Sequence, residues 1–286
     1  MYAITGITGQ VGGATARALL AAGQQVRAIV RSADKGRVWA DRGCEIAVAE
    51  ATDVPALTRA FTGLDGVFLM TPPNFDPEPG FPGVRQVIAA AVAAVAAARP
   101  GRLVYLSTVG AHVTEFNLLT NATIAEAALR PLPVPVAFLR PAWFMENAAW
   151  DVPAAKTGTV PSFLQPLDHP IPMVATADIG QTAAGLLQDR WAGTRIVELE
   201  GPARYSANDI AAGFADALGH PVRMAPVARE TWEPLFRQQG AQYPMPRIRM
   251  LDGFNEGWID FEGGAAEHRI GPTPLDAVLR ALVARP

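Results

Sequence analysis

Residues 5–13 read Thr5-Gly6-Ile7-Thr8-Gly9-Gln10-Val11-Gly12-Gly13, directly after the short apolar run that begins at Tyr2. Glycine recurs at every third position, and each of these glycines has its own function in a turn from strand to helix. Gly6 permits the tight turn, Gly9 lets a phosphate approach the backbone, and Gly12 lets the helix pack closely on the strand. The stretch therefore predicts a turn that binds a dinucleotide pyrophosphate at the start of a helix.

The first half of the chain alternates short apolar runs with helical patterns. Strands are predicted over residues 2–5, 25–30, 45–48, 66–70, 102–106 and 134–139. Helices are predicted between them, over residues 12–22, 34–41, 54–61, 82–97 and 117–129. Strands that alternate with helices form a parallel sheet covered on both faces. We therefore expect an α/β protein with a doubly wound, parallel, Rossmann-type sheet.

The pattern changes near residue 150, where segments rich in proline and glycine become frequent. We expect a cofactor-binding Rossmann domain over residues 1–150 and a smaller, irregular substrate-side domain over residues 151–286. Part of the second domain, about residues 170–199, is expected to pack back on the first. It contains a predicted helix over residues 178–187 and a predicted strand over residues 195–199. Asp178 is expected to cap that helix.

The end of the second predicted strand distinguishes NAD from NADP. A carboxylate there would accept from a ribose 2′-hydroxyl, but this chain has Arg31 instead, with Lys35 one turn later. Two cations at this place favour a 2′-phosphate, although they are also common as solvated surface charges. The N–H groups of Thr8 to Val11 are expected to face the pyrophosphate. NADP(H) is therefore the predicted cofactor, held by Gly6, Thr8, Gly9, Gln10, Val11, Arg31 and Lys35.

Composition and charge argue against several classes of function. The 286 residues are 50% hydrophobic and 18% charged, with a net charge of −3 and no long basic run, so no direct nucleic-acid partner is expected. No apolar segment is long enough to cross a membrane, and no signal peptide precedes the first strand. We expect a cytoplasmic protein with a small-molecule substrate and no metal, because histidines and carboxylates show no ligand spacing. The sequence leaves open whether the protein forms a homodimer.

Several further stretches resemble one known family. The chain is similar to the NmrA-like branch of the atypical short-chain dehydrogenases/reductases, and the resemblance runs over nearly its whole length. The most specific piece is Arg140-Pro141-Ala142-Trp143-Phe144-Met145-Glu146-Asn147. The other pieces are Leu106-Ser107-Thr108-Val109-Gly110-Ala111, Asp178-Ile179-Gly180, Leu199-Glu200-Gly201-Pro202 and Ala217-Leu218-Gly219-His220-Pro221-Val222.

The resemblance implies that NADP(H) lies in a groove between the two domains. It places further cofactor contacts after successive strands, at Glu50, Thr71, Pro72, Ser107, Thr108 and Ala142. Trp143 and Phe144 would face the nicotinamide end. With Phe75 and Asn147 they are the expected walls of a substrate pocket, although core packing is an alternative for the aromatic residues. The loop over residues 71–80 contains four prolines and is a candidate rim or lid.

The catalytic pair of many short-chain dehydrogenases is absent. That pair is a Tyr with a Lys four residues later on one helix, and none of the four tyrosines here has such a partner. The helix that would carry the pair contains Thr120-Asn121-Ala122-Thr123-Ile124-Ala125-Glu126, with neither Lys nor His. His112, after the fifth strand, is the candidate proton donor and pocket residue. A structural loop histidine is the alternative.

Three functions remain open. The first is an NADPH-dependent reductase of an activated, apolar small molecule such as a quinone, a cationic dye or a conjugated enone, because such acceptors take hydride without a strong acid. The second is a non-catalytic sensor of NADP(H), which the missing Tyr–Lys pair favours. The third is a non-redox lyase, isomerase or cyclase on the same fold. The sequence favours an enzyme of the first kind.

Overall fold

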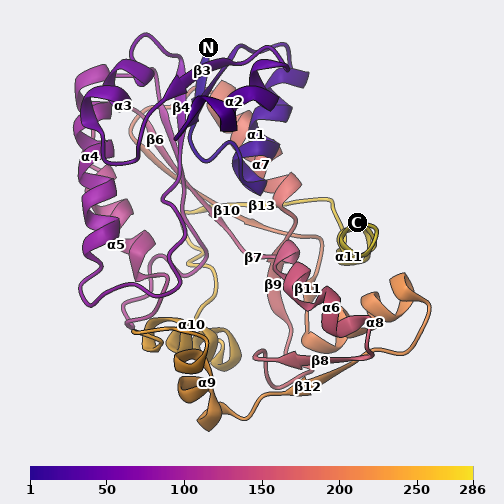
Figure 1. Ribbon diagram of the computed structural model, residues 1–286. Helices are drawn as coiled ribbons and strands as arrows, with labels where there is room; N and C mark the ends of the chain where they lie inside the picture. Colours follow the sequence, from indigo (N-terminus) through magenta and orange to yellow (C-terminus); the bar gives the residue numbers. More distant parts are fainter. Residues whose placement is uncertain (286) are drawn as a thin grey trace.

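An eight-stranded, all-parallel sheet forms the centre of the computed structural model, which describes residues 1–285 (Figure 1). Its strand order is β13-β10-β6-β5-β4-β1-β2-β3. The strands are β1 (Tyr2–Ile4), β2 (Val26–Val30), β3 (Glu45–Val48), β4 (Gly66–Leu69), β5 (Leu103–Leu106), β6 (Val136–Pro141), β10 (Thr194–Glu200) and β13 (Glu267–Ile270). The order reverses after β1, so the predicted doubly wound sheet is confirmed.

Helices cover both faces of the sheet. On one face lie α3 (Val54–Phe61), α4 (Pro82–Ala98) and α5 (Thr120–Leu129), and they share an apolar core with the strands. On the other face α1 (Gln10–Ala21) packs on α7 (Thr176–Gln188), beside α2 (Ala33–Ala40). Helices α1 and α7 approach so closely that a Cβ on Gly180 would lie 2.4 Å from the Cβ of Ala14. That contact, with β10 beside β6, joins α7 and β10 to the sheet.

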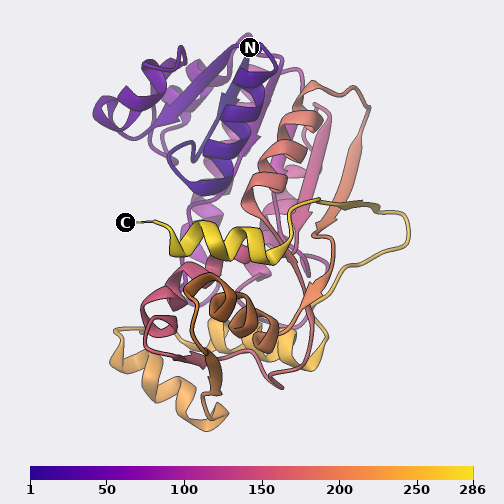
Figure 2. The ribbon, with the colours of Figure 1, turned by 90° about the vertical axis from the view of Figure 1, so that its right-hand side faces the viewer.

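A second body lies beyond the carboxyl ends of the strands (Figure 2). It has its own apolar core, which includes Trp232, Phe236 and Phe254. Its strands are β7 (Trp143–Phe144), β8 (Thr159–Ser162), β9 (Ile171–Val174), β11 (Arg204–Tyr205) and β12 (Arg223–Pro226), in sheets of order β11-β9-β7 and β12-β8. Its helices are η1 (Met145–Asp151), α6 (Val152–Ala155), α8 (Ala207–Leu218), η2 (Arg229–Thr231), α9 (Trp232–Gln238), α10 (Met245–Glu256) and α11 (Leu275–Val283).

The structure corrects the expected role of Asp178. Helix α7 begins at Thr176, and Asp178 lies within its first turn. The Asp178 carboxylate accepts from the backbone N–H and the hydroxyl of Thr273, at 2.9 and 2.7 Å. Glu146 caps the helix instead, because its two oxygens accept from the Thr176 N–H at 3.0 and 2.9 Å. The carboxylate of the Trp-Phe-Met-Glu-Asn stretch thus holds α7 in place.

No helix within residues 1–285 combines the length and the apolar composition that a membrane span requires.

Candidate functional site

The glycine-rich turn has the geometry that its sequence predicts. Gly6 has φ +61°, and its carbonyl accepts from the Gly9 N–H at 2.9 Å. A Cβ on Gly12 would lie 2.4 Å from the Gly6 carbonyl oxygen. Gly9 is the N-cap residue of α1 and has no side chain to cap it. Within residues 1–285, no group accepts from the N–H of Gln10, Val11 or Gly12. These free donors lie at the positive end of α1, an arrangement that favours an anion.

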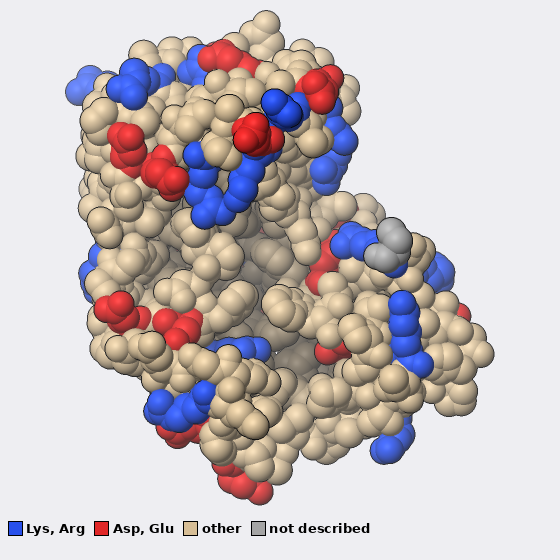
Figure 3. Space-filling view, viewed as in Figure 1, with Lys and Arg blue, Asp and Glu red and all other residues tan. Residues whose placement is uncertain are grey.

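The two predicted cations lie beside this turn. Arg31 and Lys35 are exposed, and neither forms an ion pair within the described residues, whereas the neighbouring Arg37 lies 3.7 Å from Asp34. Ser32, between them, begins α2 without a side-chain cap bond. Figure 3 shows Lys and Arg side chains gathered above a hollow between the two bodies. A dianionic 2′-phosphate would find unpaired positive charge there.

The carboxyl ends of β4 and β5 meet next to the glycine turn. Met70 lies beneath Gly6, where a Cβ would come 2.3 Å from its sulfur atom. The hydroxyl of Thr71 is 3.4 Å from the phenol oxygen of Tyr105. Burial raises the pKa of Tyr105 to about 12, so this phenol stays protonated. Of the other predicted cofactor contacts, Ala142 is buried after β6 and Glu50 is exposed after β3.

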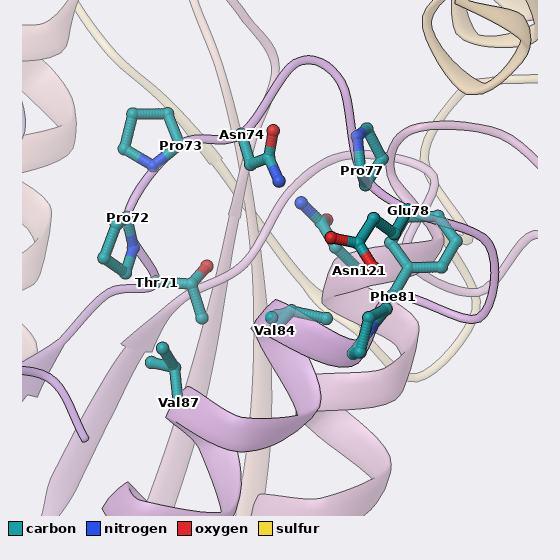
Figure 4. A pocket seen from close by; sticks show the side chains of 12 residues that line it. Thr71, Pro72, Pro73, Asn74, Pro77, Glu78, Phe81, Val84, Val87 and Asn121 are labelled. Atoms are coloured by element: carbon teal, nitrogen blue, oxygen red, sulfur yellow. The ribbon is translucent and has the colours of Figure 1, made fainter. Parts of the chain in front are cut away.

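A pocket of about 240 Å³ opens beside Thr71 (Figure 4). Most of its wall comes from the loop between β4 and α4. Its lining residues are Thr71, Pro72, Pro73, Asn74, Pro77, Glu78, Phe81, Pro82, Gly83, Val84, Val87 and Asn121. Asn121 comes from α5 and lies beside Glu78 in the close view. Asn121 was not predicted as a site residue, although it lies on α5, the helix that would carry a Tyr–Lys pair.

The loop that walls this pocket is tied to the second body. The carboxylate of Asp76 accepts from the backbone N–H groups of Gln242 and Tyr243, at 2.8 and 2.6 Å. At the end of the loop, Phe81 has a left-handed backbone with φ 56° and a buried ring. That ring packs edge-on against Phe116 at 5.8 Å. One carboxylate and one aromatic residue thus fix the loop in place beside the pocket.

The predicted pocket residues fall into two groups. Phe144 is half-buried against the core that α1 and α7 share with the sheet, and Trp143 packs edge-on against Phe254 of the second body at 5.1 Å. Phe75 is 56% exposed at the tip of the loop, and Asn147 is also exposed. None of these four contributes to the lining of the 240 Å³ pocket.

His112 lies apart from the pocket. It is exposed, it is not among the lining residues, and its imidazole is close enough to Glu262 to lower the pKa of that carboxyl slightly. The main cause of that lowered pKa is the hydrogen bond from Arg140.

Ser107 belongs to a buried charged network. Its hydroxyl donates to Glu126 of α5 at 2.5 Å, and the Arg140 guanidinium donates twice to the same carboxylate, at 2.8 and 2.7 Å. Arg140 also bonds to Glu262 at 2.5 Å and lies 3.9 Å from the buried Glu198. Burial alone would lower the pKa of Arg140, but its bonds to Glu126 and Glu262 raise it. The Ser107 proton is therefore committed to Glu126. Thr108 follows it, half-buried.

Asp151, at the end of η1, has no hydrogen bond or ion pair within residues 1–285, and burial raises its pKa to about 6. We expect Asp151→Asn to raise the free energy of unfolding at pH 8 by about 1–3 kcal/mol, because a desolvated carboxylate is removed. Between about pH 4 and 6 the native state binds more protons than the unfolded state, so wild-type stability falls as the pH rises through that range.

Urea unfolding at pH 4 and pH 8 checks this expectation, with the exposed Asp168→Asn as the control variant. The gain from Asp151→Asn should be absent at pH 4. An equal gain in the free energy of unfolding at both pH values would show that the effect does not come from the charge of the Asp151 carboxylate.

No group of three or more metal-ligating side chains occurs among residues 1–285.

Several known proteins resemble this chain in sequence and in fold. The model of the NmrA-like family matches residues 2–274. A Streptomyces griseus (4-alkanoyl-5-oxo-2,5-dihydrofuran-3-yl)methyl phosphate reductase is 31% identical, over 78% of this chain and 76% of its own. Quinone oxidoreductase 2 of Escherichia coli is 28% identical over the same shares. The Citrobacter sp. triphenylmethane reductase, solved with NADP(H), superposes with TM-score 0.81 at 21% identity, over 99% of this chain and 100% of its own. The chain therefore belongs to the NmrA-like family and has its NAD(P)-binding, atypical short-chain reductase fold.

Proposed function

We propose that the protein is an NADPH-dependent reductase of an electron-poor, largely apolar small molecule such as a quinone, a dye or a conjugated enone. The observation that carries the proposal is the position of Thr71. It follows β4 beside the glycine turn, and it also lines the proline-walled pocket. A substrate in this pocket would therefore lie next to a dinucleotide seated on α1.

The residues present fit NADP(H). The free N–H groups at the start of α1 would hold the pyrophosphate, and Arg31 with Lys35 would hold the 2′-phosphate. Thr71, Pro72, Thr108 and Ala142 would border the nicotinamide half, and residues 1–150 would form the cofactor-binding domain. When bound, the cofactor supplies a hydride. The relatives named above include a quinone oxidoreductase and a (4-alkanoyl-5-oxo-2,5-dihydrofuran-3-yl)methyl phosphate reductase, and they support the same reaction class.

The choice of an electron-poor acceptor follows from the hydroxyl groups near the site. The Tyr105 phenol is buried with a raised pKa, and Ser107 donates to Glu126. Asn121 reaches the pocket from α5, and an amide does not give up a proton. A substrate that accepts hydride before it needs a proton suits such a site, since water can protonate the product afterwards.

The missing Tyr–Lys pair also favours a second candidate, a sensor that binds NADP(H) without turnover. The experiment is to titrate NADPH and NADH by fluorescence and then to follow absorbance of the reduced nicotinamide with a panel of quinones, dyes and enones. Oxidation that requires both enzyme and acceptor supports the reductase. Tight binding without oxidation across the panel supports the sensor, and failure to bind either nucleotide overturns both.

The Arg31→Ala, Lys35→Ala double variant is expected to weaken NADPH binding about tenfold or more and to change NADH binding less than about twofold, because only NADPH carries the 2′-phosphate. Arg37→Ala removes a cation from α2, the helix that carries Lys35. It serves as the control, since Arg37 faces Asp34. Fluorescence titration of both nucleotides measures the effect. An equal loss for the two nucleotides would contradict the NADP assignment.

A further inference from the structure

Helix α10 carries two basic residues, Arg247 and Arg249, and they lie in different surroundings. Met245, Arg249 and Glu256 fall on one side of the helix by their spacing, and this side is the more exposed one. Arg247 falls on the opposite side, which it shares with Leu251 and Phe254.

That opposite side of α10 faces the junction of the two bodies. Phe254 contacts Trp143, and the Pro246 carbonyl accepts from the Leu118 N–H at 2.8 Å. Just before α10, the N–H groups of Gln242 and Tyr243 hold the pocket loop through Asp76. Figure 3 shows a hollow between the two bodies, which we call the cleft. By its helix position Arg247 faces the junction of the two bodies, and it is not among the residues that line the 240 Å³ pocket.

Arg247 has no partner of opposite charge. Arg247 is half-buried, yet within residues 1–285 its side chain forms no ion pair and no hydrogen bond. It makes a cation–π contact with Phe236, with the guanidinium carbon 4.3 Å from the ring centroid. Burial alone lowers its pKa, and no neighbouring acid opposes that effect. By contrast, Arg249 lies 3.3 Å from Asp252.

The position of Arg247 costs stability in the free protein. A partly buried cation without an anion loses part of its hydration, and no anion compensates for that loss. Arg247 also lies in the first turn of α10, where the helix dipole disfavours positive charge. The stacked Phe236 ring restricts the guanidinium and leaves its five N–H donors free. A planar anion with two oxygens matches such a donor set.

We propose that Arg247 anchors an anionic group of the substrate, a carboxylate or another oxyanion, while the apolar, electron-poor part of the same molecule occupies the cleft. The proposal rests on the proposed reductase function, because it concerns the substrate of that site. It adds a charge requirement that the apolar walls of the cleft do not impose. Bound substrate would supply the anion that the free protein lacks at this position.

The test compares methyl red, an azo dye with an aryl carboxylate, with its methyl ester at pH 8. Binding is measured by equilibrium dialysis in the presence of NADP⁺, so it does not depend on turnover. The wild type is expected to bind the carboxylate about tenfold tighter than the ester. Arg247→Met should remove this preference by weakening carboxylate binding alone, and Arg247→Lys should retain part of it. Arg249→Met, which removes a charge from the other side of α10, should keep the preference.

A wild type that binds both dyes equally, or an Arg247→Met variant that keeps the preference, would overturn the proposal. Thermal unfolding separates folding from binding, because Arg247→Met should be at least as stable as the wild type. The experiment also distinguishes failure of the anchor proposal from failure of the reductase proposal. A charge preference without NADPH oxidation supports the anchor and counts against the reductase. Oxidation of the ester and of neutral quinones without any charge preference supports the reductase and rejects the anchor.

Discussion

Gly12→Ala is expected to reduce NADPH binding at least about a hundredfold and to lower stability, because the new Cβ would meet the Gly6 backbone. That Cβ would lie 2.4 Å from the Gly6 oxygen and 2.6 Å from the Gly6 carbonyl carbon. Both are backbone atoms within the turn itself, so no side chain can move aside to relieve the clash. The turn or the start of α1 must shift, and the free N–H groups shift with it. Fluorescence titration with NADPH and circular dichroism measure the two effects.

Two further glycine variants separate loss of folding from loss of the site. Gly9→Ala adds a Cβ that is 3.2 Å from the Gly6 oxygen, at an exposed position. The variant should fold and still lose most NADPH affinity, because the methyl group occupies the place of the pyrophosphate. Gly185→Ala, inside α7, has open space at the added Cβ and should leave binding unchanged. Normal NADPH binding by Gly9→Ala would show that the phosphates lie elsewhere.

The first half of the fold could be predicted because its signals are local. The glycine spacing, the apolar runs and the helical patterns lie within short windows, and parallel strands buried on both faces follow from them. The predicted ends were close, with the first strand ending at Ile4 and the first helix beginning at Gln10. Tight turns and helix starts depend mainly on nearby residues, so the sequence shows them directly.

The second half was harder to predict because its order depends on distant contacts. Helices α9, α10 and α11 lie in or beside segments that read as rich in proline and glycine, and the sequence analysis did not assign them. Pro246 illustrates the reason. A proline in the first turn of a helix is compatible with that helix, yet in a sequence it reads equally well as a loop. Strand β13 pairs with β10 across about seventy residues, and no local pattern predicts that partner.

The candidate site shows the same division. The N–H donors of the glycine turn and the Arg31–Lys35 pair could be identified from spacing. Asn121 could not be identified in this way, because only the loop on the neighbouring strand makes it a pocket residue. The link from Asp76 to residues 242 and 243 joins segments 166 and 167 positions apart. Such contacts follow from the packing of the two bodies, and one sequence does not contain a signal for them.

Arg140→Met is expected to lower the free energy of unfolding by about 3–5 kcal/mol at pH 8, which is typical when one member of a buried ion pair is removed. The variant would leave the buried carboxylates of Glu126 and Glu198 without their nearest cation. Glu198 keeps bonds from the N–H groups of Glu262 and Gly263, at 2.7 and 3.1 Å. Glu126 would keep Ser107 and a longer, 3.5 Å contact with the exposed Arg130. Most of the loss should therefore arise at Glu126.

A double variant tests that account. Arg140→Met, Glu126→Gln removes the buried carboxylate that has lost its nearest cation and should recover much of the loss at pH 8. If urea unfolding showed no recovery in the double variant, the cost would come from packing around Arg140. Recovery would instead show that the arginine of the Arg-Pro-Ala-Trp-Phe stretch is required to neutralise the Glu126 carboxylate on α5. Its role would then be to hold α5, and with it Asn121, against the sheet.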